Sequence, residues 1–472
     1  MLLALRPVLI LAALAGAVAP SLAQDRSDQR QARAILERLV SFRSAEGQAE
    51  QLSAQTDYIV ETLRAGGVAE GDIARIEAGG FPGLVVRIPG TDAAERAVGF
   101  AAHMDVVDAR PEDWERSPFT LVEENGRLFG RGVADNKTGV TAMISTILRL
   151  HADRHRPRRT LVFIFSGDEE TGGLTAQALA RHPWVAGARY IVNTDAGLGV
   201  LTPEGQAQVY LVQGAEKTYA TYTLTATNPG GHSSRPRDDN AIYELSGALT
   251  RLAAHRFPVM TNAVTAQFFR TMAGVMGGME GNVLRAFAAN PQDPVAGELL
   301  RQNAEIGGMT RTTCVATRLD AGHADNALPQ RASATVNCRI FPGTSAEAVR
   351  ATLQEVAGAG VRVELKETTP EGPVTEPIPE VTAAITQSVR RRVPNIPVTM
   401  YQEAGATDGL WFRSAGIPTV ASSGIFAVPG QQFEHGLNEN LPAAAFYFAV
   451  EHVHDLAVAL GQVGGARRHQ ER

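Results

Sequence analysis

The sequence predicts an α/β protein in which a mostly parallel, doubly wound sheet domain is interrupted by a smaller α+β domain. Between residues 84 and 194, short apolar runs alternate with helical stretches, which is the order of βαβ units around a parallel sheet. From about Lys217 the order becomes β-α-β-β-α-β, the split-βαβ or ferredoxin-like pattern. A proline-rich stretch at 368–380 ends this part, and the first pattern then returns. The expected boundaries are 24–215 with 369–472 for the larger domain and 216–368 for the smaller one.

The first residues, 1–23, read as a secretory signal peptide that is removed from the mature chain. Arg6 supplies a positive charge, an apolar run covers 8–19, and Ser21 and Ala23 offer small residues for cleavage after Ala23. The run is shorter than the roughly 20 residues that span a bilayer, so a membrane anchor is the weaker interpretation. We therefore expect a periplasmic or secreted protein with no membrane span after processing.

In the larger domain, the spacing of apolar residues along the chain distinguishes predicted helices from predicted strands. Apolar residues recur at helical spacing through 30–66, at positions such as Leu36, Leu39 and Val40. Continuous apolar runs predict strands that are buried on both faces. These strands are expected at 84–88, 97–102, 160–166, 190–194 and 418–423, and further helices at 139–152, 175–182 and 443–460.

The smaller domain has a different pattern, because its first strand, at 219–226, alternates apolar and polar residues as half-buried strands do. An insertion at about 257–310 follows the first helix. The first helix is expected at 239–255. After the insertion we expect strands at 312–321 and 331–341, a helix near 345–357 and a strand at 361–367.

The two cysteines, Cys314 and Cys338, lie in the two strands on either side of a proline-containing turn. If these strands form a hairpin, its midpoint at residue 326 places the two thiols opposite each other. An oxidising compartment would then allow a cross-strand disulfide, whereas strained geometry would leave two buried free thiols. The sequence leaves both alternatives open, and two cysteines exclude a four-cysteine zinc site.

Composition limits the class of partner. The chain has 472 residues, of which 44% are hydrophobic, and a formal net charge of −6. Such a chain is neither disordered nor fibrous. The charge argues against a nucleic-acid-binding or anionic-lipid-binding surface, because both need clustered positive charge. We expect no nucleic-acid partner.

Polar residues follow the predicted strands at the ends where an open α/β sheet binds ligands. His103 and Asp105 follow the strand at 97–102. Histidines and carboxylates there form the nitrogen and oxygen donor set that divalent zinc takes. Each residue alone is more often an ordinary loop residue, and only their combination and order indicate metal chemistry. The other candidates are Glu169 and Glu170 after 160–166, Asp195 after 190–194, Asp135 in a glycine-rich turn before a helix, and His435 in a late loop.

This combination resembles the di-zinc exopeptidase family of carboxypeptidase G, carboxypeptidase S, aminoacylase and carnosinase. The matching blocks are FAAHMDVV, LFGRGVADNKTG, FSGDEETGG, NTDAG, GGHSSRP and FEHGLNEN, in the family's order across nearly the whole mature chain. WERSPF, VNCRIFPG and the long insertion look most similar to the carboxypeptidase S-type branch. The resemblance implies a di-metal catalytic domain at 24–215 and 369–472 and a lid or dimerisation domain at 216–368.

The resemblance also implies a set of metal ligands. Asp135 would bridge two Zn²⁺ ions, for which Co²⁺ or Mn²⁺ could substitute. His103 and Asp195 would complete one site, and Glu170 and His435 the other. Two Zn²⁺ ions, three carboxylates and a hydroxide between the ions sum to zero charge, so the site could accept an anionic substrate.

Two further residues acquire roles around the metals. Glu169 would be the general base that takes a proton from the water between the ions and passes it to the leaving amine. Asp105 would hold the far nitrogen of His103 and so orient that ligand. The peptide bond between Asp135 and Asn136 is expected to be cis, as is common in the family.

Substrate contacts are implied mainly in the smaller domain. His232 would polarise the scissile carbonyl, and in related enzymes this residue often comes from the partner in a homodimer. Asn326 and Arg339 would hold the substrate carbonyl and carboxylate, since a guanidinium can donate two parallel hydrogen bonds to a carboxylate. Gly405 would contribute a backbone contact.

Three functions are weighed on these residues. The leading hypothesis is a zinc carboxypeptidase or dipeptidase that cleaves the last amide bond of dipeptides or short peptides with a free carboxylate. The alternative is an N-acyl-amino-acid amidohydrolase, which would differ in a pocket lined by the insertion. A non-catalytic exported binding protein is disfavoured because Glu169 accompanies the whole ligand set, and a serine hydrolase because no G-x-S-x-G elbow is present. Side-chain preference, native metal and oligomeric state stay open.

Overall fold

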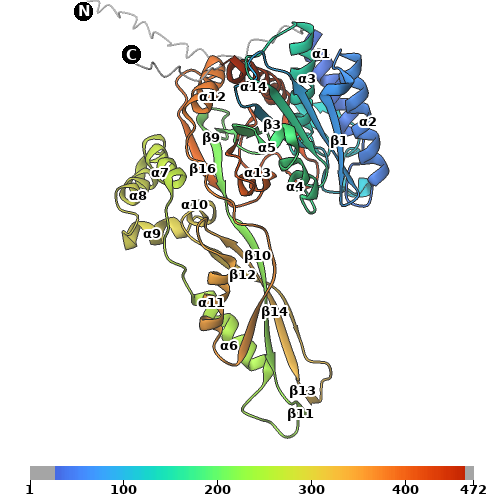
Figure 1. Cartoon of the computed structure of the whole chain (residues 1–472). Helices are drawn as coiled ribbons and strands as arrows, with labels where there is room; N and C mark the ends of the chain where they lie inside the picture. The colour runs from blue at the N-terminus through green and yellow to red at the C-terminus, as the bar shows by residue number, and fades with distance from the viewer. Residues whose placement is uncertain (1–26, 463–472) are drawn as a thin grey trace, which may run out of the picture.

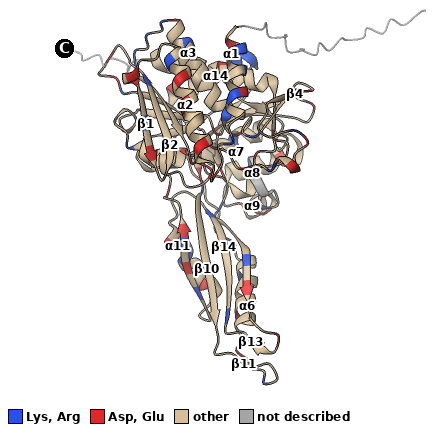
Figure 2. Cartoon of the chain, turned by 90° about the vertical axis from the view of Figure 1, so that its right-hand side faces the viewer, with Lys and Arg blue, Asp and Glu red and all other residues tan. Residues whose placement is uncertain are grey.

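The computed structural model describes residues 27–462, so the signal peptide expected at 1–23 lies outside the described residues. A large mixed sheet with helices on both faces forms the upper body in Figure 1, and a narrow arm extends below it. Figure 2 shows acidic and basic residues interspersed over both parts. The predicted fold class is confirmed.

The main sheet has the strand order β1-β2-β6-β3-β7-β17-β9-β8-β18, with β16 paired to β9. The central pairs β6–β3, β3–β7 and β7–β17 are parallel, and the β1–β2 hairpin adds an antiparallel edge. Its strands are β1 (Ile73–Ala78), β2 (Phe81–Ile88), β3 (Val98–His103), β6 (Leu161–Ser166), β7 (Tyr190–Asn193), β8 (Gly199–Leu201), β9 (Ala207–Glu216), β16 (Val398–Glu403), β17 (Thr419–Ala421) and β18 (Phe426–Ala427).

Two hydrophobic layers cover this sheet, because alternate residues of each strand point to opposite faces. Leu84 and Val86 of β2 enter one layer, and Val85 between them enters the other. The first layer is covered by α1 (Ser27–Val40), α2 (Ala49–Ala65), α3 (Lys137–Ala152), α12 (Pro379–Arg392) and α14 (Ala443–Gln462), and the second by α4 (Leu174–Ala180), α5 (Pro183–Ala186) and α13 (Gly409–Ser414).

Helix α14 is long and apolar enough to cross a membrane by length and composition alone. It packs against α3 and α12, and Phe446, Val453 and Leu456 are buried in the main core. These contacts are those of a buried core helix, and such helices also have the length and apolar composition of a membrane span.

The arm is built on an antiparallel sheet of order β12-β14-β10-β15, with α6 and α11 packed on one face. Its chain order is the predicted β-α-β-β-α-β. The elements are β10 (Thr218–Thr227), α6 (Ala241–Ala254), β12 (Thr313–Ala321), β14 (Arg331–Ile340), α11 (Ala346–Ala357) and β15 (Val361–Thr368), and a small pair, β11 (Gly231–His232) with β13 (Ala327–Leu328), lies at the tip.

The two cysteines are opposite each other in the β12–β14 hairpin, where Cys314 pairs with Cys338 in the strand register. Their sulfur atoms are bonded at 2.01 Å. Of the two alternatives that the sequence left open, the structure therefore has the disulfide.

The insertion forms four short helices, of which α7 packs against β16 and β9 of the main sheet and the next helices pack on one another. Phe268 and Phe269 of α7 share a buried cluster with Tyr401 of β16 and with residues of the next two helices. These helices are α7 (Ala263–Val275), α8 (Gly278–Ala289), α9 (Pro294–Arg301) and α10 (Ala304–Gly308). A third small sheet, absent from the sequence expectations, joins β4 (Val122–Glu124), β5 (Arg127–Phe129) and β19 (Asn440–Pro442).

Candidate metal centre

The predicted ligands converge at the carboxyl ends of neighbouring parallel strands. His103 is the last residue of β3, Glu170 follows β6 in the next strand position, and Asp195 follows β7 on the other side. Asp135 lies in the turn that leads into α3, and His435 lies in the loop between β18 and β19. Because β6, β3 and β7 run parallel, their carboxyl ends meet at one edge of the sheet.

The side chains meet around Asp135. Its Oδ1 lies 2.8 Å from His103 Nε2, and its Oδ2 lies 3.2 Å from His435 Nε2. His103 Nε2 is also 3.2 Å from Asp195 Oδ1, and His435 Nε2 is 3.0 Å from Glu170 Oε2. One carboxylate therefore faces two separate donor groups, one with each of its oxygens.

The donor atoms also satisfy the requirement of a divalent-cation site. His103, Asp135 and Glu170 offer atoms that all lie within 4.8 Å of one another, and so do His103, Glu169 and Asp195. Nitrogen and carboxylate oxygen donors in such groups suit Zn²⁺. These two groups have His103 in common, whereas the contacts of Asp135 with His103 and His435 would suit two adjacent cations that share its carboxylate.

Without cations, the buried carboxylates of this cluster crowd negative charge together, and both their burial and this crowding shift their pKa values. Burial raises the pKa of Glu169 well above its usual value, and the negative charge of Asp195 adds to the rise. Burial likewise raises the pKa of Asp195 to about 8, against the opposing effect of His103. Hydrogen bonds to Asp135 and Glu170 raise the pKa of His435 to about 10. Carboxylates crowded in this way need positive charge, which divalent cations supply.

Asp105 positions two of the acidic residues through their backbone. Its Oδ1 accepts a hydrogen bond from the Glu169 N–H at 3.1 Å, and its Oδ2 accepts one from the Glu170 N–H at 3.0 Å. Its carboxylate is 3.5 Å from His103 Nδ1, whereas the backbone carbonyl of Asp105 is closer, at 3.1 Å. Asp105 thus links His103 to the turn of Glu169 and Glu170. The sequence analysis expected only its contact with His103.

The turn that carries Asp135 has the expected cis peptide bond between Asp135 and Asn136. The Asn136 side chain then caps α3, because its Oδ1 accepts a hydrogen bond from the Gly139 N–H at 3.2 Å. Its amide also donates to Thr194 Oγ1 at 3.3 Å, next to Asp195. The turn before α3 is therefore joined directly to the end of β7.

Glu439 is a buried residue that the sequence analysis missed. One of its oxygens accepts hydrogen bonds from Arg131 Nη1 at 2.8 Å and the Gly132 N–H at 2.9 Å. The other accepts from the Ala134 N–H at 2.8 Å and the Asp135 N–H at 3.1 Å. Burial raises the pKa of Glu439 to about 7, and the Arg131 charge opposes this rise. Four donors around one carboxylate hold the Asp135 turn against the loop that carries His435.

Two further buried acids, Asp168 and Asp408, were also missed, although Asp168 stands in the quoted block FSGDEETGG. Asp168 accepts hydrogen bonds from the Leu174 and Thr175 N–H groups at 2.7 and 2.9 Å, and so fixes the turn after β6. Asp408 accepts a hydrogen bond from Ser166, the last residue of β6. Both act on the segment that presents Glu169 rather than on a ligand directly.

The four predicted substrate contacts fall into two separate places. Arg339, at the end of β14, donates to the Ala404 carbonyl at 3.4 Å, so it lies beside Gly405 at the junction of arm and body. His232 and Asn326 lie together at the far tip of the arm, where the Ser233 N–H donates to the Asn326 carbonyl at 3.0 Å (Figure 1). The structure does not bring His232 or Asn326 to the metal centre of the same chain.

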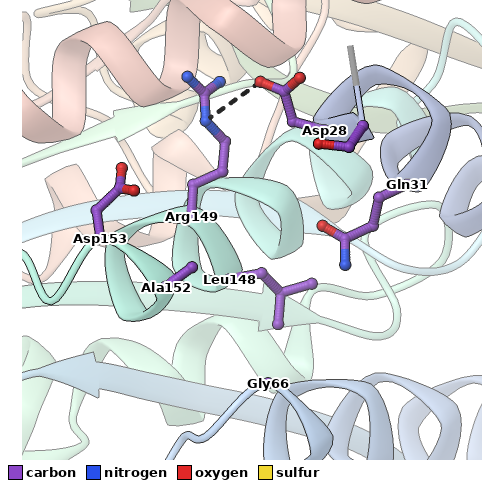
Figure 3. Close-up of a pocket in the computed structure, with 8 residues that line it drawn as sticks. Asp28, Gln31, Gly66, Leu148, Arg149, Ala152 and Asp153 are labelled. Carbon is purple, nitrogen blue, oxygen red and sulfur yellow. Dashed lines mark ion pairs between the residues drawn. The ribbon is translucent and has the colours of Figure 1, made fainter.

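A cavity of about 120 Å³ opens beside the predicted ligands and is lined by Asp135, Asp195, Gln432 and Glu434, among others. A larger hollow of about 810 Å³ lies elsewhere, around α1 and α3, where Asp28 and Arg149 form an ion pair of 3.8 Å (Figure 3). The described residues that line this second hollow include none of the predicted site residues, so the small cavity is the one associated with the chemistry.

Comparison with known proteins supports this centre. Residues 99–459 match the model of Peptidase family M20/M25/M40. The chain is 27% identical over 380 residues to the N-fatty-acyl-amino acid synthase/hydrolase PM20D1 of Homo sapiens, covering 78% of this chain and 75% of that protein. It is 28% identical to the probable carboxypeptidase S-like 2 of Dictyostelium discoideum, covering 56% of this chain and 51% of that one.

A solved structure shows the same fold. The metallo-carboxypeptidase Sso-CP2 of Sulfolobus solfataricus superposes with a TM-score of 0.68 at 18% identity, over 91% of this chain and 99% of that one. The chain spans about half the length of several curated relatives, including the Dictyostelium protein.

Proposed function

This chain belongs to peptidase family M20/M25/M40 and is a metallo-hydrolase, and from that premise we propose that it cleaves the amide bond of small substrates with a free carboxylate. The observation that carries the proposal is the Asp135 carboxylate, whose two oxygens face His103 and His435 separately. His103 and Asp195 would hold one Zn²⁺ ion, Glu170 and His435 the other, and Asp135 both. Such a pair of cations readies a water for attack and polarises the substrate carbonyl.

Glu169 is the general base in this proposal. Its carboxylate lies in the same donor group as His103 and Asp195, and burial keeps its proton affinity high. It would take the proton of the attacking water and deliver it to the leaving amine. Asp105 sets its position by accepting the Glu169 N–H.

The leading substrate class is a dipeptide or short peptide that loses its C-terminal residue. Arg339 would bind the carboxylate of that residue, and Gly405 beside it would offer a backbone contact. A second candidate substrate class is an N-acyl amino acid. The curated relatives that carry the name N-fatty-acyl-amino acid synthase/hydrolase favour this second class.

We also propose that the chain is exported and that His232 acts across a homodimer formed through the arm. The Cys314–Cys338 disulfide supports an oxidising compartment. The position of His232 at the tip of the arm, beside Asn326, supports a role on another copy of the chain.

The test is a metal count and a substrate panel on the purified mature chain. We expect two bound Zn²⁺ per chain and turnover of dipeptides, N-acyl amino acids or both. Glu169→Gln should retain both metals and lose turnover, whereas Glu37→Gln, at an exposed position of α1, should behave as wild type. Unchanged turnover of Glu169→Gln would remove Glu169 from the role of base, and absence of metal would refute the proposed centre.

A further inference from the structure

A cluster of cations lies at the junction of arm and body, outside the metal centre. Lys217 is the single residue between β9 of the main sheet and β10 of the arm, which form one continuous path in Figure 1. The Lys217 N–H donates to the Glu403 carbonyl at 3.2 Å, and Arg339 donates to the next carbonyl, that of Ala404. Lys217 and Arg339 therefore border the same short loop.

The register of the arm sheet places these side chains on one face. Arg339 is directly opposite Tyr219 on one side and Thr313 on the other. Lys217 is two residues before Tyr219, so it points to the same face, away from α6 and α11. The contacts agree, because Lys217 Nζ lies 3.4 Å from Thr313 Oγ1 and the Arg339 guanidinium lies 5.0 Å from the centre of the Tyr219 ring.

Lys217 is buried without a counter-charge. Only 1% of the residue is exposed, and among the described residues its ammonium has no carboxylate within ion-pair distance. The nearest acids on the chain are engaged elsewhere. Glu216 pairs with Arg413 at 2.6 Å, and Glu403 accepts hydrogen bonds from Tyr401 and from the Ala404 and Gly405 N–H groups.

The neighbours add positive charge instead of cancelling it. Burial, together with the positive charges of Arg339 and Arg311, lowers the pKa of Lys217 to about 7. Arg311 makes contacts of 3.4–3.5 Å with the Gly297 carbonyl and Thr310 Oγ1. A buried ammonium on the same sheet face as the Arg339 guanidinium is unfavourable unless an anion joins them.

The choice of lysine adds to this argument. The chain has only three lysines, Lys137, Lys217 and Lys366, and otherwise uses arginine. Lys137 is also buried, but its ammonium donates to the Leu39 and Phe42 carbonyls at 2.8 and 2.6 Å. Among the residues 27–462 that the structure describes, the Lys217 ammonium has only the long contact with Thr313, so its hydrogen-bonding capacity is largely unused.

We propose that Lys217 is a substrate-binding residue that joins Arg339 in recognising the free carboxylate of the substrate. The inference rests on the proposed function, since it assigns the second cation of the carboxylate site. Arg339 would provide the planar donor pair, and Lys217 a compact charge beside Thr313. Binding the carboxylate would supply a negative charge to this cluster and so favour the charged form of Lys217.

The test compares matched substrates and two lysine variants in the metal-loaded enzyme. An N-acyl amino acid and a dipeptide are each assayed beside the corresponding C-terminal amide. Lys217→Met keeps the aliphatic stem and removes the charge, and Lys366→Met changes an exposed lysine of β15 as control. We expect Lys217→Met to raise KM for the carboxylate substrates roughly ten-fold or more, as for loss of a charged hydrogen bond, with kcat little changed. KM for the amides should not move.

A direct binding measurement separates this proposal from the proposed function. Calorimetry measures binding of the product amino acid and of its amide to wild type and both variants. Wild type should bind the free amino acid more tightly, and Lys217→Met should reduce that preference about ten-fold while Lys366→Met keeps it. Equal effects on carboxylate and amide ligands would overturn the role of Lys217 even if hydrolysis is observed. Absence of hydrolysis with a carboxylate preference that depends on Lys217 would refute only the proposed reaction.

Discussion

Replacing Glu439 by glutamine should weaken both the fold and the metal centre. The side chain is fully buried and accepts four hydrogen bonds, two on each oxygen. Glutamine has the same size but only one acceptor oxygen, and its NH₂ group would face two of those donors. In either orientation, two donors lose their acceptor.

The expected loss follows from those contacts. A hydrogen bond to a charged group contributes about 1.5–3 kcal/mol, and removing one partner of a buried ion pair costs about 3–5 kcal/mol. Because Arg131 would also stay buried without its counter-charge, we expect the Glu439→Gln chain to lose about 3–5 kcal/mol of unfolding free energy. Since Ala134 and Asp135 are among the donors, metal affinity should fall by about 10–100-fold.

Urea unfolding of the metal-free chain measures the first quantity, and metal titration in competition with a chelator measures the second. Glu37→Gln, which removes an exposed carboxylate from α1, serves as the control and should match wild type in both. The reasoning is refuted if Glu439→Gln unfolds within about 1 kcal/mol of wild type and also binds metal with unchanged affinity.

Three further predictions concern the metal, the pH and the arm. Chelation should lower the melting temperature, and added Zn²⁺ should restore it, because the crowded carboxylates around Asp135 then regain their cations; a melting temperature insensitive to chelator would contradict the centre. Burial lowers the pKa of His452 in the folded chain to about 3. In the unfolded chain this histidine takes up a proton below about pH 6.5, whereas in the folded chain it stays neutral, so the free energy of unfolding decreases as pH falls. At pH 5 the loss of unfolding free energy is about 2 kcal/mol. His452→Gln should reduce by that amount the difference between the unfolding free energies measured in urea at pH 7 and pH 5, and an unchanged difference would exclude the effect. Mixing the inactive variants His232→Ala and Glu169→Gln should restore part of the activity if His232 acts from a second copy, and mixtures that stay inactive would argue for action within one chain.

The sequence was sufficient to predict the fold class and the residues that gather at the metal centre. Strand ends can be read from apolar runs, and parallel neighbours bring those ends together, so His103, Glu170 and Asp195 were placed correctly relative to the sheet. Asp135 and His435 lie in turns without a periodic pattern, so their residue types and positions made them candidates and the family resemblance assigned their ligand roles. Their joint position in the structure agrees with that selection.

Other features could not be predicted, for physical reasons. Glu439 acts by accepting backbone N–H groups of a distant turn, and one glutamate in a polar loop carries no pattern that reveals such partners. The docking of α7 on β16 depends on the shape of Phe268, Phe269 and Tyr401 in contact, whereas the sequence shows only apolar residues. Short strands such as β5 and β19 pair although more than 300 residues separate them in the chain, so no local period predicts their pairing.

The packing of the insertion on the body has a consequence for how far the arm can swing. Because α7 lies against β16, the chain passes between body and arm four times: after β9, before α7, after α10 and after β15. The two middle passages are themselves joined, since the Met260 N–H donates to the Thr310 carbonyl at 2.8 Å. A rotation large enough to carry the tip toward its own metal centre must bend all four segments together, which is consistent with the proposal that His232 acts on a neighbouring copy.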